Sequence, residues 1–330
     1  EAIESVKKCQ AAGVQVKMIT GDHIITAMAI ANQLGLDMGR ESQLKAVTGR
    51  ELDKTTDEDL PKLAERTSVF ARVTPEQKLK LVRALQQQGH VVAMTGDGVN
   101  DAPALKQADI GVAMGISGTE VAKGAADMLL TNDNFSSIEA AIEEGRGVFD
   151  NLTKFIVWTL PTNMGEGLII LAAIMAGTAL PVMPVHILWI NMATALLLGL
   201  MLVFEPKEID LMQRKPREPK SPILSTPLIL RIILVSLIIL TGAFGMFLLE
   251  RRVFGTDLQT AQTVVVNVIV MVEVAYLLNC RSLLHSMFQI GIFSNKWIFG
   301  GIAGIIGAQL LITYTPLLNK ILHTAPIGLA

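Results

Sequence analysis

The sequence predicts an α/β domain with parallel strands over residues 1–148, followed over residues 149–330 by an α-helical bundle that spans a membrane. Charged residues and short apolar runs alternate as far as about residue 148. From Leu152 onward the chain consists mostly of apolar runs of roughly twenty residues, the length of a membrane-spanning helix. The composition agrees, because 51% hydrophobic residues is more than an ordinary soluble domain contains.

The first element with chemical content is the turn Met18–Asp22, which follows a strand-like apolar stretch. In this turn Thr20 offers a hydroxyl group and Gly21 a backbone N–H. A helix is expected over roughly 24–33, and its N-terminus would point at the same place. Because helix N-termini attract phosphate, the turn is a candidate phosphate-binding element.

A second turn, Thr95–Lys106 with the sequence TGDGVNDAPALK, follows the apolar stretch 90–94, which predicts a buried parallel strand. Asp97 and Asp101 stand four residues apart at the end of that strand, where open α/β sheets bind ligands. Carboxylate oxygens suit Mg²⁺. An ordinary acidic turn is the alternative, but the two turns together predict a pocket for phosphate and Mg²⁺ built from two strand ends.

These turns, with Lys78 in the segment TPEQKLK between them, resemble motifs of the haloacid-dehalogenase-type phosphorylation domain of P-type cation ATPases. Further segments resemble the type II, calcium-pump-like branch: TGREL at 48–52, VFARVTPEQK at 69–78, ADIGVAMGISGTEVAK at 108–123 and DNFSSI at 133–138. The resemblance continues through the apolar half. It implies a partial haloacid-dehalogenase-like, Rossmann-type phosphorylation domain ahead of the membrane helices.

The resemblance also implies ATP and Mg²⁺ as cofactors. Asp97 would coordinate Mg²⁺, and Asn100 and Asp101 would orient and hold that arrangement. Lys78 would neutralise the transferring phosphoryl group, which needs fixed positive charge because its transfer is catalysed mostly by electrostatics.

The turn after the first strand receives its role from the same resemblance. Thr20 and Gly21 would donate hydrogen bonds to phosphoryl oxygens. Asp22 would lie on the side of the nucleotide.

One part of the family pattern is missing, because the DKTGT motif that carries the phosphorylated aspartate does not occur in this sequence. The segment Asp53–Thr56 imitates it but lacks the glycine and follows no apolar strand. By resemblance, the chain is expected to be a fragment that contains the later part of the phosphorylation domain and family helices five to nine. Its partners would be the rest of the pump chain, namely the actuator domain, the nucleotide-binding domain and the earlier helices.

The apolar half predicts about five membrane spans, at 152–176, 185–203, 227–249, 261–280 and 297–315. The loop between the second and third spans carries five positive charges: Lys207, Arg214, Lys215, Arg217 and Lys220. Such an excess is typical of cytoplasmic loops. The prediction is a multi-pass protein of the cell membrane, in contact with the lipid bilayer, with its soluble domain in the cytoplasm.

The overall charge and the cysteine content argue against a nucleic-acid-binding protein and against a disulfide-rich secreted protein. The formal net charge of −2 argues against a nucleic-acid partner. The two cysteines, Cys9 and Cys280, fit a reducing compartment without a disulfide framework.

A second group of polar residues stands inside the predicted spans. Glu166 lies midway along an apolar helix with Asn163 one turn earlier, Asn191 and Thr194 repeat that spacing on the next span, and Glu273 lies deep in the fourth. Carboxylates are costly at membrane depth and are usually functional there. The group predicts a dehydrated cation site, and polar contacts between helices are the alternative.

By resemblance these positions match the calcium-pump pattern, with one departure. Ala195 stands where the family has a cation-bridging aspartate, so the two-site calcium arrangement loses its shared ligand and both stoichiometry and ion identity are open. Glu208 and Asp210 align with acidic loop positions that couple the membrane helices to the phosphorylation domain in calcium pumps.

The predicted function is ATP-driven cation transport through an aspartyl-phosphate intermediate, with Ca²⁺ as the ion. Transport of another cation is the alternative within this class. From other classes, a membrane-anchored phosphatase of the dehalogenase type and a catalytically inactive membrane partner stay open. The phosphatase would still need the missing aspartate nucleophile.

Overall fold

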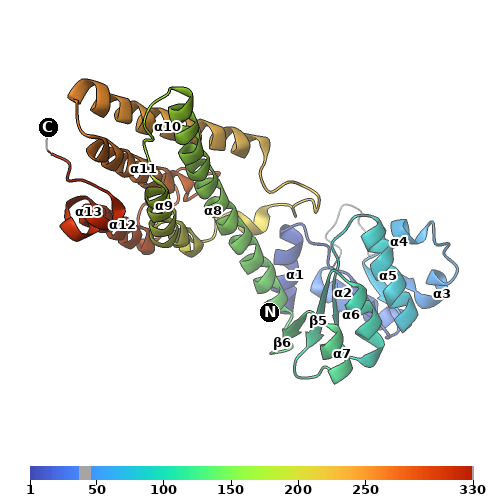
Figure 1. The fold of residues 1–330 in the computed structure, drawn as a ribbon. Helices are drawn as coiled ribbons and strands as arrows, with labels where there is room; N and C mark the ends of the chain where they lie inside the picture. The colour runs from blue at the N-terminus through green and yellow to red at the C-terminus, as the bar shows by residue number, and fades with distance from the viewer. Residues whose placement is uncertain (37–45, 329–330) are drawn as a thin grey trace. The chain divides into compact units, whose positions relative to one another are not determined.

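The computed structural model describes residues 1–36 and 46–328. The chain divides into two compact units, and each is considered by itself. The first comprises Glu1–Gly145 with Ile209–Ser221, and the second comprises Arg146–Glu208 with Pro222–Ala330 (Figure 1).

The first unit contains two three-stranded parallel sheets. In one the order is β1 (Met18–Thr20), β3 (Val69–Ala71) and β2 (Ala46–Thr48), and in the other it is β4 (Ala93–Gly96), β5 (Ile110–Met114) and β6 (Met128–Leu130). Every strand pair is parallel, because a helix or helical turn separates successive strands. This is the predicted α/β class.

Short helices connect these strands. They are α1 (Ala2–Ala11), α2 (Ile24–Leu34), α3 (Gly49–Leu52), α4 (Leu60–Arg66), α5 (Pro75–Gln87), α6 (Ala102–Gln107) and α7 (Glu120–Ala125), with 3₁₀ turns at Val99–Asp101 and Leu211–Gln213. The start of α5 is fixed by its sequence. Thr74 and Gln77 form a capping box, and Pro75 stands at the first helical position, where its missing N–H costs nothing.

The prediction of a buried strand at 90–94 was wrong in position and in burial. Strand β4 runs from Ala93 to Gly96, only Met94 in it is buried, and Val91 before it is 60% exposed. The reason is that β4 pairs only with β5 within the described residues, so it is an edge strand. Strand β1 likewise pairs only with β3 there, so in each sheet the strand that precedes a predicted ligand-binding turn has one unpaired edge among the described residues.

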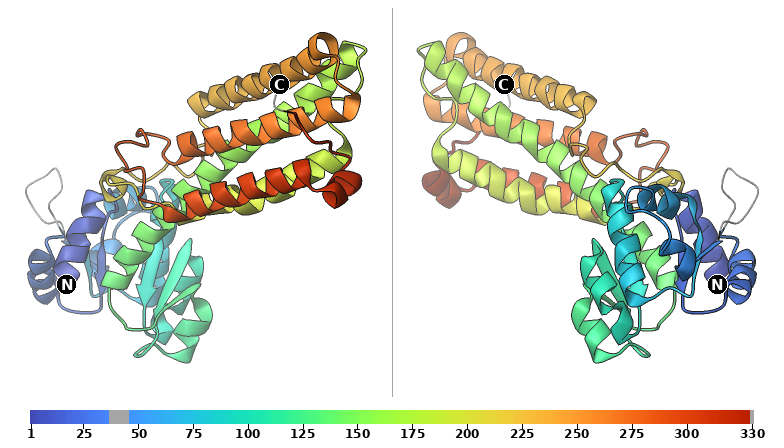
Figure 2. Two further views of the ribbon diagram at one scale, coloured as in Figure 1. Left: turned by 90° about the vertical axis from the view of Figure 1, so that its left-hand side faces the viewer. Right: turned by 90° about the vertical axis from the view of Figure 1, so that its right-hand side faces the viewer.

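The second unit is a bundle of long helices. They are α8 (Ser136–Met175), which continues from the first unit, α9 (Pro184–Leu197) with a 3₁₀ extension at Gly199–Phe204, α10 (Thr226–Leu249) with a π-helical turn at Glu250–Phe254, α11 (Leu258–Cys280) and α12 (Lys296–Tyr314), followed by the short α13 (Pro316–Leu322). Within the described residues, five helices are long and apolar enough to cross a membrane, which confirms the predicted number. Helix α11 lies between α10 and α9, and α12 packs beside α9 (Figure 2).

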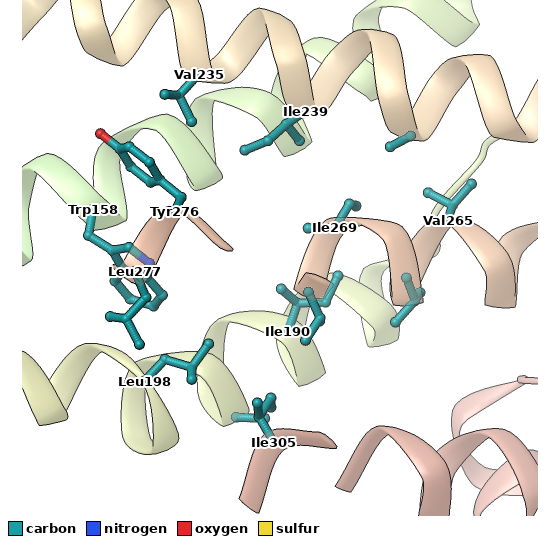
Figure 3. Close-up of a cluster of buried hydrophobic side chains, with 14 of the residues drawn as sticks. Trp158, Ile190, Leu198, Val235, Ile239, Val265, Ile269, Tyr276, Leu277 and Ile305 are labelled. Atoms are coloured by element: carbon teal, nitrogen blue, oxygen red, sulfur yellow. The ribbon is translucent and has the colours of Figure 1, made fainter. Parts of the chain in front are cut away.

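The core of this unit is the apolar cluster drawn in Figure 3, built on Trp158 from α8, Ile190 from α9, Ile239 from α10 and Ile269 from α11. Helices α8 and α10 approach closely at Gly165, where an added Cβ would lie 2.7 Å from the Ile239 side chain. Because all these helices contribute to one cluster, polar groups on their inner faces are held at fixed positions.

Candidate functional site

Backbone hydrogen bonds join the turn after β1 to the turn after β3. The backbone N–H of Asp22 donates to the Thr20 hydroxyl (3.1 Å), and the backbone N–H of Val73 donates to the Thr20 carbonyl (3.2 Å). The Arg72 N–H donates to the Asp22 carbonyl at 3.1 Å. Gly21 and Asp22 are exposed at this strand end, and a Cβ on Gly21 would meet nothing within 4 Å. The turn is therefore ordered by its backbone and leaves polar groups accessible.

Helix α5 brings Lys78 to the turn after β4. Its Nζ lies 2.5 Å from Oδ1 of Asp101, whose side chain is 9% exposed. The other carboxylate oxygen of Asp101 accepts a hydrogen bond from the Gly98 N–H at 3.3 Å. Gly96 has to be small here, because an added Cβ would lie 2.5 Å from the Cβ of Asp101. Asp101 thus holds a lysine ammonium group in place, a contact that the sequence alone did not reveal.

Asp97 and Asn100, from the same turn, are both exposed. The Asp97 carbonyl accepts a hydrogen bond from the Thr119 N–H (2.8 Å). Its carboxylate makes no hydrogen bond or ion pair with any residue that the structure describes. Since Asp101 is engaged by Lys78, Asp97 is the free carboxylate of this turn.

These residues fit a Mg²⁺ ion that is shared with a phosphate group. Among the described residues there is no cluster of three acidic, histidine or cysteine side chains that would cage a metal. Mg²⁺ does not require one, because it commonly binds one or two carboxylates, substrate phosphates and water. Asp97 is the side chain that would hold it.

Three strand ends meet at this site. Thr74, the N-cap of α5, follows β3, whose end is hydrogen-bonded to the turn after β1, and Lys78 one turn later contacts the turn after β4. Ile19 of β1 also packs against the apolar cluster that contains Met94 of β4. The structure therefore places Thr20, Asp22, Lys78 and Asp101 around one end of the parallel strands.

In the helical bundle, two carboxylates from different helices are buried close together. Glu166 on α8 is 4% exposed and Glu273 on α11 is 1% exposed. The Asn191 amide of α9 donates to Glu166 Oε2 at 3.0 Å, and the hydroxyl of the buried Thr194 lies within hydrogen-bonding reach of Glu273. Oε1 of Glu166 and Oε2 of Glu273 are buried and have no hydrogen-bond partner among the described residues.

The position of Glu273 is fixed by contacts between α8 and α11. Trp158 Nε1 donates to the carbonyl of Glu273 at 3.2 Å. One turn later the Tyr276 hydroxyl donates to the Val157 carbonyl at 3.2 Å. That carbonyl lacks its helical partner because Pro161, four residues on, has no N–H. A proline within an apolar helix is the sequence signal for such a contact between helices.

Not every predicted cation ligand joins this pair. Asn163 is exposed on α8, one turn from Glu166, and makes no hydrogen bond with any described residue. Ala195, next to Thr194, is half-buried and brings no oxygen from its side chain. The structure thus brings together Glu166, Asn191, Thr194 and Glu273, and leaves Asn163 outside.

Buried ion pairs stand at one end of the bundle. Lys154 Nζ lies 3.1 Å from Glu208 Oε1, and Arg281 Nε donates to Glu205 Oε1 at 2.8 Å. The His285 ring lies 3.3 Å from the other oxygen of Glu208. Burial alone would raise the pKa of Glu208, but Lys154 and hydrogen-bond donors around it hold that pKa below its usual value. Sequence reasoning singled out Glu208 and missed Lys154, Glu205 and Arg281, although ionisable groups near the ends of apolar helices were visible.

The second predicted loop acid, Asp210, lies beside Arg214, with 2.7 Å between a carboxylate oxygen and the guanidinium. The coupling role of these two acids stays a prediction.

Family comparisons agree with both units. Residues 179–330 match the family described as cation transporting ATPase, C-terminus, and residues 1–109 and 78–142 match families described as haloacid dehalogenase-like hydrolase. Over nearly its whole length the chain is similar to cation-transporting ATPases. It is 56% identical over 329 residues to the probable cation-transporting ATPase F of Mycobacterium tuberculosis (strain ATCC 25618 / H37Rv), covering 99% of this chain and 36% of that protein.

Other members of the cation-transporting ATPase family match over the same extent. The cation-transporting ATPase pma1 of Synechocystis sp. (strain ATCC 27184 / PCC 6803 / Kazusa) is 46% identical over 335 residues, which cover 99% of this chain and 36% of that protein. The calcium-transporting ATPase of Bacillus subtilis (strain 168) is 41% identical over 327 residues, with the same coverage of 99% and 36%. The chain therefore spans little more than a third of the length of these relatives.

Proposed function

We propose that this chain supplies the ion site and part of the phosphoryl-transfer site of an ATP-driven cation pump that works through an aspartyl phosphate, with Ca²⁺ as the transported ion. The observation that carries the proposal is the pair of buried carboxylates, Glu166 and Glu273, each with one oxygen that has no partner. An unpartnered polar atom in an apolar interior is destabilising. A dehydrated cation between the two carboxylates would remove that penalty.

The charge balance favours one divalent ion. Glu166 and Glu273 carry two negative charges when ionised, and Asn191 and Thr194 add neutral oxygens. No lysine or arginine forms an ion pair with either carboxylate among the described residues. Hard oxygen ligands suit Ca²⁺, and calcium transport is also what the names of several relatives state.

At the other site, this chain's residues would bind and neutralise the phosphoryl group. Asp101 keeps the Lys78 ammonium group oriented, and the turn after β1 offers the Thr20 hydroxyl and the Gly21 N–H. Mg²⁺, held by Asp97, would neutralise further phosphate charge when bound. The aspartate that receives the phosphoryl group would come from a DKTGT segment outside this sequence, and the edges of β1 and β4 that are unpaired among the described residues are where another parallel strand could add.

The test is cation-activated phosphorylation of the complete pump by ATP. Glu166→Gln and Glu273→Gln should each shift the activating calcium concentration upward by at least about tenfold, because each removes a charge that no water replaces. Glu218→Gln, on an exposed loop residue, is the control and should keep the original calcium dependence. If both membrane variants matched the control, the carboxylates would have only a structural role.

A further inference from the structure

A cavity of about 500 Å³ lies in the second unit between α10, the end of α11 and the loop that follows α11. It is lined by Arg231, Ala275, Leu278, Asn279, Ser282, Leu283, Leu284, His285, Ser286, Met287 and Phe288. None of these residues belongs to the ion site or to the phosphoryl-transfer site. Ala275, Asn279 and Ser286 are exposed, so the cavity is open to the surroundings of the bundle.

The cavity contains one full positive charge and no carboxylate. Arg231 Nη2 donates to the carbonyl oxygen and to Oδ1 of Asn279, at 2.9 Å and 2.5 Å, and the guanidinium lies 5.3 Å from the centre of the Tyr276 ring. These partners are neutral, and within the described residues no acidic group pairs with Arg231. The guanidinium also contacts Cys280 Sγ at 3.7 Å and lies within hydrogen-bonding reach of the Tyr276 hydroxyl, and both of these groups are neutral too, so no partner among the described residues balances the charge of Arg231.

The other polar groups of the lining differ in how far they are engaged. The Ser282 hydroxyl accepts backbone hydrogen bonds from Leu284 and His285, and the His285 ring faces Glu208. The exposed Ser286 makes no hydrogen bond through its hydroxyl with any described residue. Arg231 and Ser286 are therefore two of the lining groups that can donate to an anion.

The surroundings of the cavity are apolar and exposed. On α10, Leu230 and Leu234 beside the arginine are 62% and 59% exposed, and on the loop Leu284 and Phe288 are 69% and 72% exposed. Helix α10 is one of the five helices able to cross a membrane, and Arg231 stands in its second turn. The charge thus lies near one end of a span, where lipid headgroups meet hydrocarbon.

We propose that this cavity binds an anionic phospholipid. The phosphate accepts hydrogen bonds from Arg231 and Ser286, and the acyl chains lie along the exposed leucines of α10. A guanidinium group suits phosphate because it presents several donors in a plane. A lipid with net negative charge is preferred over a zwitterionic one, because no carboxylate in the lining can pair with a choline group.

The site is tested by lipid retention on the full-length protein in native mass spectrometry, with phosphatidylglycerol and phosphatidylcholine of equal chain length. The unchanged protein should retain phosphatidylglycerol about fivefold more strongly, the factor for one arginine near an anionic lipid surface. Arg231→Gln should remove this preference, and Arg231→Lys should keep part of it. Arg252→Gln removes an exposed charge at the other end of the same span and should change nothing.

A second variant covers the case in which Arg231→Gln fails to fold. Ala275→Trp fills the cavity from an exposed position and leaves the arginine in place, and it should also abolish selective retention. The proposal is overturned if phosphatidylcholine is retained equally by the unchanged protein, or if either cavity variant still selects phosphatidylglycerol. Displacement of the lipid by millimolar inorganic phosphate would contradict the lipid assignment and leave a site for free phosphate.

Discussion

The two aspartates of the turn after β4 differ in their surroundings, although the sequence presents them alike. Asp101 is buried and holds Lys78, whereas Asp97 is exposed and has no partner among the described residues. The difference follows from the backbone, because the 3₁₀ turn Val99–Asp101 directs the second carboxylate under Gly96 and Gly98. Asp97 is therefore the carboxylate of this turn that is accessible to a Mg²⁺ ion.

Replacing Asp97 with asparagine in the complete pump should lower phosphoenzyme formation from ATP by at least about a hundredfold, because Mg²⁺ loses its charged ligand. The amount of folded protein in the membrane should stay the same. Radioactive phosphate incorporated from ATP measures the effect. Asp57→Asn, on an exposed residue with no role in the site, is the control. Normal phosphoenzyme in the Asp97 variant would remove this residue from the site.

Asp133 gives a residue-scale prediction about pH. Its carboxylate accepts hydrogen bonds from the backbone of Ile116 (3.0 Å) and Ser117 (2.7 Å), and these donors lower its pKa to about 2 from the ordinary 3.8. A group whose pKa is lower in the folded state stabilises the fold above the unfolded pKa, and this contribution disappears as pH falls through the folded pKa. The stabilising contribution is therefore present above about pH 4 and lost toward pH 2.

Asp133→Asn should remove this contribution while it keeps a residue that tolerates the local positive φ of 49°. The melting temperature of the variant should lie below that of the unchanged protein above pH 4, and the two should converge toward pH 2. Thermal unfolding followed across that pH range measures it. A constant difference at every pH would show that the carboxylate charge is not involved.

At the scale of elements, α8 and α11 are joined through a carbonyl that a proline leaves without a partner. Tyr276 donates a hydrogen bond to the Val157 carbonyl, and Trp158 donates one to the Glu273 carbonyl. Both contacts lie within about one helical turn of Glu273. The two contacts set the depth at which Glu273 stands opposite Glu166. The hydrogen bond that Pro161 removes from α8 is thus replaced by a contact from α11.

Tyr276→Phe should destabilise the bundle by about 1–3 kcal/mol, because it leaves the Val157 carbonyl buried and unpaired. In a Pro161→Ala background the same change should cost less, since the new N–H at position 161 can pair with that carbonyl. Thermal unfolding of the four proteins of this cycle in detergent measures the coupling. Tyr314→Phe, at an exposed tyrosine, is the control. Equal cost in both backgrounds would argue against the proline explanation.

Sequence patterns predicted the helices and strands better than they predicted the contacts between them. The five spans were visible because length and apolarity are local properties, and the parallel α/β class followed from alternating strands and helices. The exposure of β4 was missed, because burial depends on which strand lies beside it. The pair Lys78 and Asp101 and the outward position of Asn163 were also missed, since both depend on how separate elements pack.

At the scale of the whole molecule, the chain carries the buried carboxylates and the lysine and aspartate of the proposed phosphoryl-transfer site, while it spans 36% of the length of the relatives compared above. The two proposed sites lie in separate units. The buried pair of Lys154 and Glu208 stands where α8 enters the bundle, next to the division between the units at Gly145. Removing one member of a buried ion pair is costly, so Lys154 and Glu208 hold α8 to the segment that follows α9.

The ion site is tested most directly by counting calcium ions bound to the complete pump at equilibrium, with radioactive calcium and the phosphorylation sites counted on the same sample. Two divalent ions close together would bring four positive charges into a site for which Glu166 and Glu273 supply two negative charges, and Ala195 supplies none. We expect about one calcium ion per phosphorylation site, and we expect Ala195→Asp to increase that number. Two ions per site in the unchanged protein, or no calcium binding at all, would contradict the account.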